Sequence, residues 1–322
     1  MKKIMALAVI FTAIISATNF SSCNNGESLT TASSDRDSIK KVLERGEYLA
    51  TNVAGCVDCH SKRDFNQYSG PTIPGTDGGG GFLFDEKMGL PGKIFAKNIT
   101  PDNETGIGSW TDAEIIRAVT QGITKNGDTL FPIMPYAAYN RMAKEDLLSI
   151  VAYIKTLKPI RNKVLPRKLF MPVAAVYPGA ALQASVDNKR PVESDKVAYG
   201  EYLVTMADCG TCHSPLTPRG PDMTRRFAGG YPFDGVSFKV TSSNITPDAA
   251  SGIGSWTEAQ FVSKFSYYRE EKSYNFRPGK HNTVMPVTLY AQMTDEDLKA
   301  VFAYLKSLKP ISNKVNKYPV GE

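Results

Sequence analysis

Two copies of one five-residue pattern constrain this chain more than any other feature of its sequence. The pattern is C-x-x-C-H, and it reads Cys56-Val57-Asp58-Cys59-His60 in the first half and Cys209-Gly210-Thr211-Cys212-His213 in the second. Two thiols at this spacing can add to the two vinyl groups of one porphyrin, and the adjacent histidine can then bind the iron. The sequence therefore predicts two covalently bound haem c groups, one on each pattern.

The alternatives to haem attachment are a redox C-x-x-C that happens to precede a histidine and a structural zinc site. The chain of 322 residues has five cysteines, and the two patterns use four of them. The fifth, Cys23, stands alone, so no thiols remain for a second pair of zinc ligands or for a disulfide framework. The cysteine count therefore favours haem attachment.

The N-terminus predicts export from the cytoplasm. Two lysines precede an uncharged, mostly apolar run, Ile4–Thr18, which is typical of a secretory signal. The run ends in small residues before Cys23, as in the lipobox of bacterial lipoproteins, although Phe20 departs from that pattern. We expect a signal peptide over residues 1–22, an acylated Cys23, and a lipid-anchored protein of the bacterial cell envelope that faces the periplasm. There are two alternatives. The signal could be cleaved without acylation, which leaves a free Cys23, or it could stay uncleaved and act as an anchor.

The two halves repeat the same motifs in the same order, with a period of about 150 residues. Asn98–Asp102 recurs as Asn244–Asp248, and Gly106–Thr111 recurs as Gly252–Thr257. A repeat of this length is the size of a domain. We predict a flexible tether over 23–38, domains over 39–165 and 196–322, and a proline-interrupted linker over 166–195.

Each repeat is predicted to be helical, so the expected fold class is all-α. Apolar spacing predicts a helix over Ile39–Val53, and prolines limit the last helices to Lys144–Leu157 and Asp295–Leu308. Thr111 and Thr257 each precede an acidic or amide residue by three positions, which predicts a capping box at a helix start.

The sixth ligand of each iron decides the class of function, because an iron with an open position can bind small ligands. Met134 and Met285 lie at equivalent places downstream of the two patterns, each followed by proline. A thioether is a soft ligand that suits haem iron, so we predict iron ligation by His60 with Met134 and by His213 with Met285. Core packing of the methionines and ligation of the second haem by His281 are the alternatives.

The order of helix, C-x-x-C-H, N-I-T-P-D, G-I-G-x-W, Met-Pro and terminal helix resembles class I cytochrome c. The tandem arrangement is similar to the cytochrome c subunits of membrane-bound alcohol, aldehyde and gluconate dehydrogenases. Those subunits typically carry three haem motifs and a C-terminal anchor, whereas this chain carries two motifs and a polar C-terminus. The resemblance implies two tandem class I domains, each a small helical fold around one covalent haem.

The resemblance also implies roles for single residues. Gly46 and Gly200 would let the terminal helices of each half cross closely, and Trp110 and Trp256 would donate indole N–H groups to haem propionates. Each proximal imidazole would donate its other N–H to a backbone carbonyl or a similar acceptor. The basic pairs at 62–63 and 225–226 are expected on the solvated surface.

These features predict a dihaem electron carrier rather than an enzyme. Single electrons would pass from a donor dehydrogenase or quinol-oxidising complex to an acceptor such as a terminal oxidase. The net charge of +6 is offset by four propionates, and no basic-aromatic cluster predicts nucleic-acid binding. No small-molecule substrate is expected. One alternative is a dihaem peroxidase-like enzyme with one open haem. Another is a fixed subunit of a dehydrogenase complex. A third, a haem-based gas sensor, would need an output domain.

Overall fold

The computed structural model describes residues 26–176, 188–218, 220–234 and 238–319. The chain divides into two compact units, residues 1–40 and 41–322. The predicted signal peptide and Cys23 lie outside the described residues. Apart from residues 39–40, both predicted cytochrome domains lie within the second unit, and the boundaries proposed for them stay a prediction.

Helix α1 spans Gly26–Tyr48, so it begins inside the segment that we expected to be a flexible tether. That expectation was wrong from Gly26 onward. Although residues 27–38 are rich in serine, threonine and aspartate, neither glycine nor proline interrupts the chain between Gly26 and Gly46. Polar residues without such breakers are compatible with a helix.

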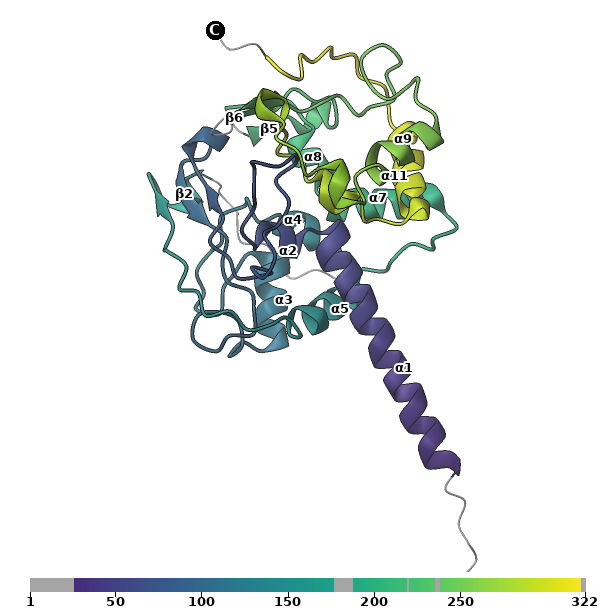
Figure 1. Ribbon diagram of the computed structural model, residues 1–322. Helices are drawn as coiled ribbons and strands as arrows, with labels where there is room; N and C mark the ends of the chain where they lie inside the picture. The colour runs from purple at the N-terminus through teal and green to yellow at the C-terminus, as the bar shows by residue number, and fades with distance from the viewer. Residues whose placement is uncertain (1–25, 177–187, 219, 235–237, 320–322) are drawn as a thin grey trace, which may run out of the picture. The chain divides into compact units, whose positions relative to one another are not determined.

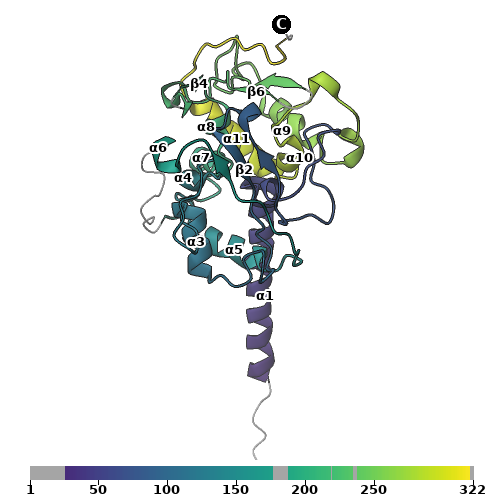
Figure 2. The ribbon, with the colours of Figure 1, turned by 90° about the vertical axis from the view of Figure 1, so that its left-hand side faces the viewer.

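From the attachment motif onward, the α-helices follow the same order in the two halves. The predicted last helices are confirmed to within a turn at their C-terminal ends. In the first half the helices are η1 (Leu49–Val53, a π-helix), α2 (Cys56–Cys59), η2 (Glu86–Met88), α3 (Asp112–Gln121), α4 (Tyr136–Tyr139) and α5 (Lys144–Ile154). In the second half they are α7 (Lys196–Met206), α8 (Cys209–Cys212), η3 (Met223–Arg225), α9 (Glu258–Ser266), η4 (Glu271–Ser273), η5 (Gly279–His281), α10 (Val287–Tyr290) and α11 (Asp295–Ser307). Figures 1 and 2 show α3 and α5 grouped apart from α9 and α11.

Both predicted capping boxes are present. The Thr111 hydroxyl accepts a hydrogen bond from the Glu114 N–H while the Glu114 carboxylate accepts one from the Thr111 N–H, and Thr257 and Gln260 repeat this exchange. These bonds satisfy backbone donors that would otherwise be unpaired at the starts of α3 and α9. Among the described residues, none of the helices combines the length and apolarity that a membrane crossing requires.

Short strands in the loops correct the all-α prediction. They form antiparallel pairs in the order β1-β2-β3, β4-β5 and β6-β7, with β1 (Leu83–Phe84), β2 (Gly92–Phe95), β3 (Lys168–Leu169), β4 (Leu216–Thr217), β5 (Gly220–Pro221), β6 (Pro232–Asp234) and β7 (Lys239–Thr241). The loops between the haem motifs and the last helices are long, so their backbone groups pair with one another where helix hydrogen bonds are lacking.

The described part of the linker contains β3 and helix α6 (Val173–Val176). Lys168 and Leu169 pair with Lys93 and Gly92 of the first half, and Val173 is buried in a small cluster with Ile94 and Phe131. The start of the linker therefore adds to the first half.

The terminal helices of each half cross at a glycine, as expected. Gly46 of α1 lies against Ser149 of α5, and Gly200 of α7 lies against Ala300 of α11. A Cβ atom on either glycine would overlap the carbonyl oxygen opposite, so only glycine permits this approach. The two crossings bring each attachment motif close to the last helix of its own half.

One hydrophobic cluster joins the two halves. It includes Leu49 and Met142 from the first half and Leu203 and Met293 from the second, all nearly inaccessible to solvent. The burial of Met142 and Met293 excludes them as surface residues and fits a packing role. Because the cluster is continuous, the two repeats share a core within the unit 41–322.

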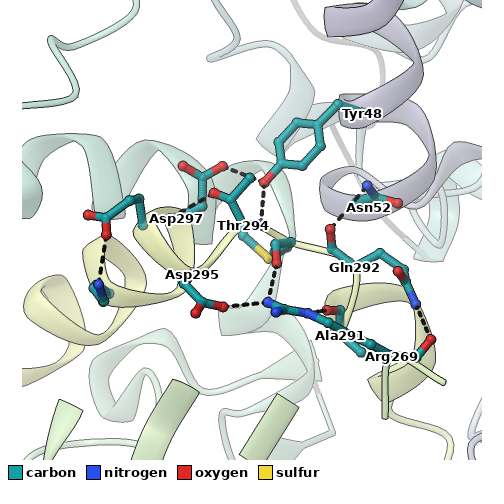
Figure 3. Close-up of polar contacts among 11 residues, drawn as sticks. Tyr48, Asn52, Arg269, Ala291, Gln292, Thr294, Asp295 and Asp297 are labelled. Carbon is teal, nitrogen blue, oxygen red and sulfur yellow. Dashed lines mark hydrogen bonds and ion pairs between the residues drawn. The ribbon is translucent and has the colours of Figure 1, made fainter. Parts of the chain in front are cut away.

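Polar contacts across this core are reciprocal. The Tyr48 hydroxyl of the first half donates to Asp297 of the second at 2.5 Å and accepts from the Thr294 N–H at 3.1 Å (Figure 3). The Tyr202 hydroxyl of the second half donates to Asp146 of the first at 2.8 Å. Equivalent residues of the repeat thus exchange the same bond, as in an isologous interface.

Candidate functional site

Each C-x-x-C-H pattern folds into a single helical turn that begins after a left-handed residue. Gly55 (φ +67°) precedes Cys56, and Asp208 (φ +47°) precedes Cys209. The N–H of each histidine closes the turn by donating to the carbonyl of the first cysteine, at 3.0 Å for His60 and 2.9 Å for His213. Both thiols and the imidazole of each motif are therefore gathered on one turn of backbone.

The four thiols are free. Cys56 and Cys209 are half-buried, whereas Cys59 and Cys212 are exposed. Burial and a neighbouring charge nevertheless raise the pKa of Cys59 to about 12. One thiol of each motif is thus exposed to solvent.

Both imidazoles are oriented by a backbone carbonyl, as the resemblance implied. His60 Nδ1 lies 2.6 Å from the Lys97 carbonyl oxygen, and His213 Nδ1 lies 2.7 Å from that of Ser243. A carbonyl only accepts, so Nδ1 carries the proton and the lone pair of Nε2 is free to bind iron. Burial lowers the pKa of both imidazoles, which favours the neutral form that ligates metals.

Two glycines hold the backbone of the histidines, and the sequence analysis did not connect them with the site. The Gly80 N–H donates to the His60 carbonyl at 2.7 Å, and the Gly229 N–H donates to the His213 carbonyl at 2.7 Å. Both have positive φ, and a Cβ on either would collide with the backbone of the loop that contains Asn98 or Asn244. The signal was a run of adjacent glycines before N-I-T-P-D in both halves, with Gly80 18 residues before Asn98 and Gly229 15 residues before Asn244.

The repeated N-I-T-P-D motif supports the carbonyls that orient the imidazoles. Asn98 accepts from Thr100 and donates to the Ile160 carbonyl at 2.7 Å, and Asn244 repeats these contacts with Thr246 and Ile311. These bonds fasten the loop behind each histidine to the segment that follows the last helix. The motif is therefore a support for the site rather than a ligand.

The structure places the two proposed methionine ligands in equivalent loops just before α4 and α10. Met134 is half-buried and packs against the same hydrophobic cluster as Cys56. Met285 is also half-buried. Iron ligation by these methionines stays a prediction. His281, the alternative ligand, is exposed, and its ring lies 5.1 Å from that of Tyr318.

The two tryptophans are half-buried, and their propionate role stays a prediction. Trp110 precedes α3, and Trp256 packs against a hydrophobic cluster of the second half. Trp256 also lines an open recess of about 660 Å³ together with Lys264, Tyr267 and Tyr268.

A helix after each methionine packs against the other half. α10 contacts η1, and α4 contacts α7. The Tyr139 hydroxyl of α4 donates to the Ala54 carbonyl at 2.6 Å, and the Tyr290 hydroxyl of α10 donates to the Ala207 carbonyl at 3.1 Å. Each short helix thus lies between the start of its own attachment turn and the partner half.

The two attachment motifs are close enough to interact electrostatically. Burial, Asp208, Cys209 and Cys59 of the first half together raise the pKa of Cys212 to about 12. Burial is the main cause, and Cys59 makes the smallest of the contributions that raise this pKa.

One arginine of each basic pair, Arg63 and Arg226, is not on the solvated surface, which corrects our expectation, whereas Lys62 is exposed as expected. The Arg63 side chain is only 7% exposed and lies 3.1 Å from Asp58, inside the first C-x-x-C-H pattern. Arg226 is half-buried against Phe227, and its Nε has no hydrogen-bond partner in the described part of the chain. Charged residues within a loop can fold back onto an attachment turn, and residue type alone does not reveal this.

The donor set at each motif fits a covalent haem c. Two thiols share one helical turn with an imidazole whose Nε2 is unprotonated, and the same construction occurs twice. The sequence model of the cytochrome c family matches residues 197–309. The second half contains a cytochrome c domain. This domain implies a covalently bound haem c in the second half. Attachment through Cys209 and Cys212 with His213 as iron ligand stays a prediction.

The chain is similar to curated cytochrome c subunits over most of its length. It is 30% identical over 300 residues to the cytochrome c subunit of a quinone-dependent alcohol dehydrogenase from Gluconacetobacter polyoxogenes, which covers 88% of this chain and 59% of that protein. It is 31% identical over 294 residues to the gluconate 2-dehydrogenase cytochrome c subunit of Pantoea cypripedii, which covers 86% of this chain and 62% of that protein. The expected resemblance is confirmed.

A shorter relative matches nearly end to end. The chain is 29% identical over 280 residues to a diheme c-type cytochrome from Cereibacter sphaeroides, which covers 83% of this chain and 86% of the relative. By contrast, the chain spans about three fifths of the length of the dehydrogenase subunits.

Proposed function

We propose that the chain is a dihaem c-type cytochrome made of two tandem class I domains, each with one His/Met-ligated haem, that carries single electrons. The observation that carries the proposal is the repeated geometry. Each half has a C-x-x-C-H turn, an Nδ1 hydrogen bond to a carbonyl and a Met-Pro loop at the equivalent position. One relative is named as diheme, which supports two haems.

Each residue of a site would have its own role. Haem c, when bound, supplies an iron that changes its charge by one electron. The cysteines hold the group in place, and His60 and His213 are oriented by their carbonyl partners so that Nε2 stays available. Met134 and Met285 would each supply a thioether as second protein ligand, which would close the iron to other ligands and raise its potential.

The arrangement of the halves suits transfer between the two haems. The short helices that follow the methionines contact the other half, since α10 packs against η1 and α4 against α7. Electrons entering one half would therefore have a path to the other.

The proposed donors are a dehydrogenase or a quinol-oxidising complex, and the proposed acceptor is a terminal oxidase. The names of the similar subunits support a dehydrogenase donor. We further propose that acylated Cys23 anchors the chain in the bacterial envelope, facing the periplasm. Membrane localisation of the wild type, and its loss on Cys23→Ser, tests this anchor.

A second candidate is a fixed electron-transfer subunit of a dehydrogenase complex, which the same relatives favour. Co-purification distinguishes the two: a fixed subunit elutes with a dehydrogenase at constant ratio, whereas a carrier elutes alone. The peroxidase-like alternative needs one open haem, and both halves retain Met-Pro.

Visible spectra of the purified protein test the proposal. They are recorded oxidised, reduced, and reduced under carbon monoxide. If carbon monoxide leaves the reduced spectrum unchanged, both irons are closed and the carrier is supported. If one haem of the wild type readily binds carbon monoxide, the carrier is replaced by an enzyme or a sensor.

A further inference from the structure

We infer that Ser69, a residue of the first half, is a positioning residue for Met285, the proposed iron ligand of the second half. This inference rests on the proposed function, because it assumes that Met285 binds the second iron. Residues 62–70 of the first half, here called the Ser69 loop, contact the backbone on both sides of Met285. The sixth ligand of the second haem would thus be held by the other half of the chain.

The Ser69 hydroxyl makes two hydrogen bonds that bracket Met285. It donates to the Met285 carbonyl at 2.7 Å and accepts from the Val287 N–H at 2.8 Å. Ser69 is fully buried, so water cannot readily replace it in either bond. Both partners are backbone groups of the Met-Pro segment, so the two bonds fix the path of the chain that carries the thioether.

Asn282 completes the contact from the side of the second half. Its side-chain oxygen accepts from the Ser69 N–H at 2.9 Å and from the Thr283 N–H at 2.8 Å. Its amide nitrogen donates to the Phe65 carbonyl at 2.9 Å. Asn282 is 1% exposed, so all of these bonds are made within the protein interior.

The Ser69 loop is itself fastened to the first attachment turn. Arg63 donates to the carbonyls of Ser69 and Gly70 at 2.6 Å and 2.7 Å, and it pairs with Asp58 at 3.1 Å. Tyr68 stacks on Tyr268, with ring centroids 5.1 Å apart. A continuous set of contacts therefore runs from Asp58, between the first two cysteines, to Met285.

The arrangement is one-sided. The Met134 N–H donates to the Phe131 carbonyl at 3.2 Å, and the Met134 carbonyl accepts from the Tyr136 N–H at 2.8 Å, as the Met285 carbonyl also does from the Val287 N–H. Within the described part of the chain, Met285 has in addition the Ser69 hydroxyl of the other half, and Met134 has no such bond. The Ser69 loop is part of the segment from His60 to Gly80, which is longer than the equivalent segment from His213 to Gly229. The extra length lets the first half reach across. The second haem, and not the first, should therefore depend on the neighbouring half for its sixth ligand.

The test replaces Ser69 by glycine. Ser69 has φ +67°, a conformation that glycine adopts readily, so Ser69→Gly removes the hydroxyl without backbone strain. Ser307→Ala is the matched control, because its hydroxyl bonds only locally, to the Tyr304 carbonyl. Carbon monoxide uptake by the reduced protein and the thioether-to-ferric-haem absorption band are measured. Met134→Ala and Met285→Ala supply the spectra of an open first and an open second haem.

Loss of a buried hydrogen-bond pair should make dissociation of Met285 roughly tenfold easier. In Ser69→Gly we therefore expect faster carbon monoxide uptake at one haem, with the spectrum of Met285→Ala, and no change in Ser307→Ala. Combining Ser69→Gly with Met285→Ala should add nothing further, because Ser69 acts through Met285.

Each outcome separates the inference from the proposed function. If the wild type already binds carbon monoxide, the carrier proposal fails first. If the wild type is closed and Ser69→Gly matches it, or opens the Met134 haem instead, the positioning role is overturned and the carrier stands. If both haems open equally, Ser69 supports the fold in general, and the inference is wrong.

Discussion

Tyr202 donates a 2.8 Å hydrogen bond to Asp146, which lies in the last helix of the other half. Tyr48 and Asp297 make the same contact in the opposite direction. Asp146 is 1% exposed and also pairs with Arg45 and Arg190, so its charge is fully surrounded by donors. Two repeats of one chain thus pack as two copies of one protein would, each burying a carboxylate of the other.

Removing either tyrosine hydroxyl should destabilise the protein. In Tyr202→Phe, Asp146 loses a buried donor and the Ala143 N–H loses its acceptor, so unfolding should become easier by about 1–3 kcal/mol. Tyr48→Phe should cost a similar amount, because Asp297 and Thr294 are affected in the same way. Urea unfolding of each variant measures the loss.

A suitable control is Tyr318→Phe, whose hydroxyl makes an exposed contact with the His281 carbonyl. It should change the free energy of unfolding by less than about 0.5 kcal/mol. Equal effects of all three variants would show that the reciprocal contacts have no special role.

Alanine at Gly200 should be poorly tolerated. The new Cβ would collide with the Ala300 carbonyl, which separates α7 from α11 and opens the core next to the second attachment turn. We expect the free energy of unfolding to fall by at least about 3 kcal/mol, or the holoprotein to fail to accumulate. Gly89→Ala is the control, because Gly89 also has a positive φ of +79° but has open space around it. The free energy of unfolding of this variant should fall by only about 1 kcal/mol. Similar losses at both positions would contradict the close-approach argument.

Stability should depend on pH through Asp208. Burial raises the pKa of Asp208 from its ordinary value of 3.8 to about 6. The folded state therefore disfavours the charged carboxylate, which lowers the free energy of unfolding. This loss of stability is absent at pH values below the pKa of the unfolded state and complete at pH values above the pKa of the folded state. Asp208→Asn removes the charge and keeps an acceptor for the Thr211 hydroxyl.

We expect Asp208→Asn to be more stable than the wild type by about 3 kcal/mol near pH 8, with the gain disappearing as the pH falls toward about 4. Denaturant unfolding at several pH values provides the measurement. A gain that is equal at all pH values would show that the charge of Asp208 is not its source.

The number of haems can be counted directly. The wild type should carry two covalent haems by intact mass, and a variant with Cys209→Ala and Cys212→Ala should carry one. The corresponding change at Cys56 and Cys59 should also leave one haem. A wild-type mass with a single haem would overturn the dihaem proposal while leaving the cytochrome c domain of residues 197–309 in place.

The repeats, the attachment motifs and the capping boxes could be predicted from the sequence, because each depends on residues close together in the chain. A thiol pair and a histidine at fixed spacing share one helical turn wherever that turn lies. Thr111 and Glu114 are likewise three residues apart, so their exchange of hydrogen bonds is a local property.

The expectations that were wrong concern residues whose environment depends on distant parts of the chain. Arg63 was expected on the surface because a basic pair usually is, but folding of the Ser69 loop places it against Asp58. The all-α class missed the strands because pairing of loop backbone, as between Gly92 and Leu169, depends on how the linker returns to the first half.

The sequence by itself determined what chemistry each half can hold: two thiols, an imidazole and a methionine candidate in a repeated order. Only the tertiary structure decided how the halves depend on each other. Ser69 and Met285 are far apart in the chain, as are Tyr48 and Asp297, and no periodicity or motif links them. Such contacts arise because burial of a shared core forces polar groups from both halves to satisfy one another where water is excluded.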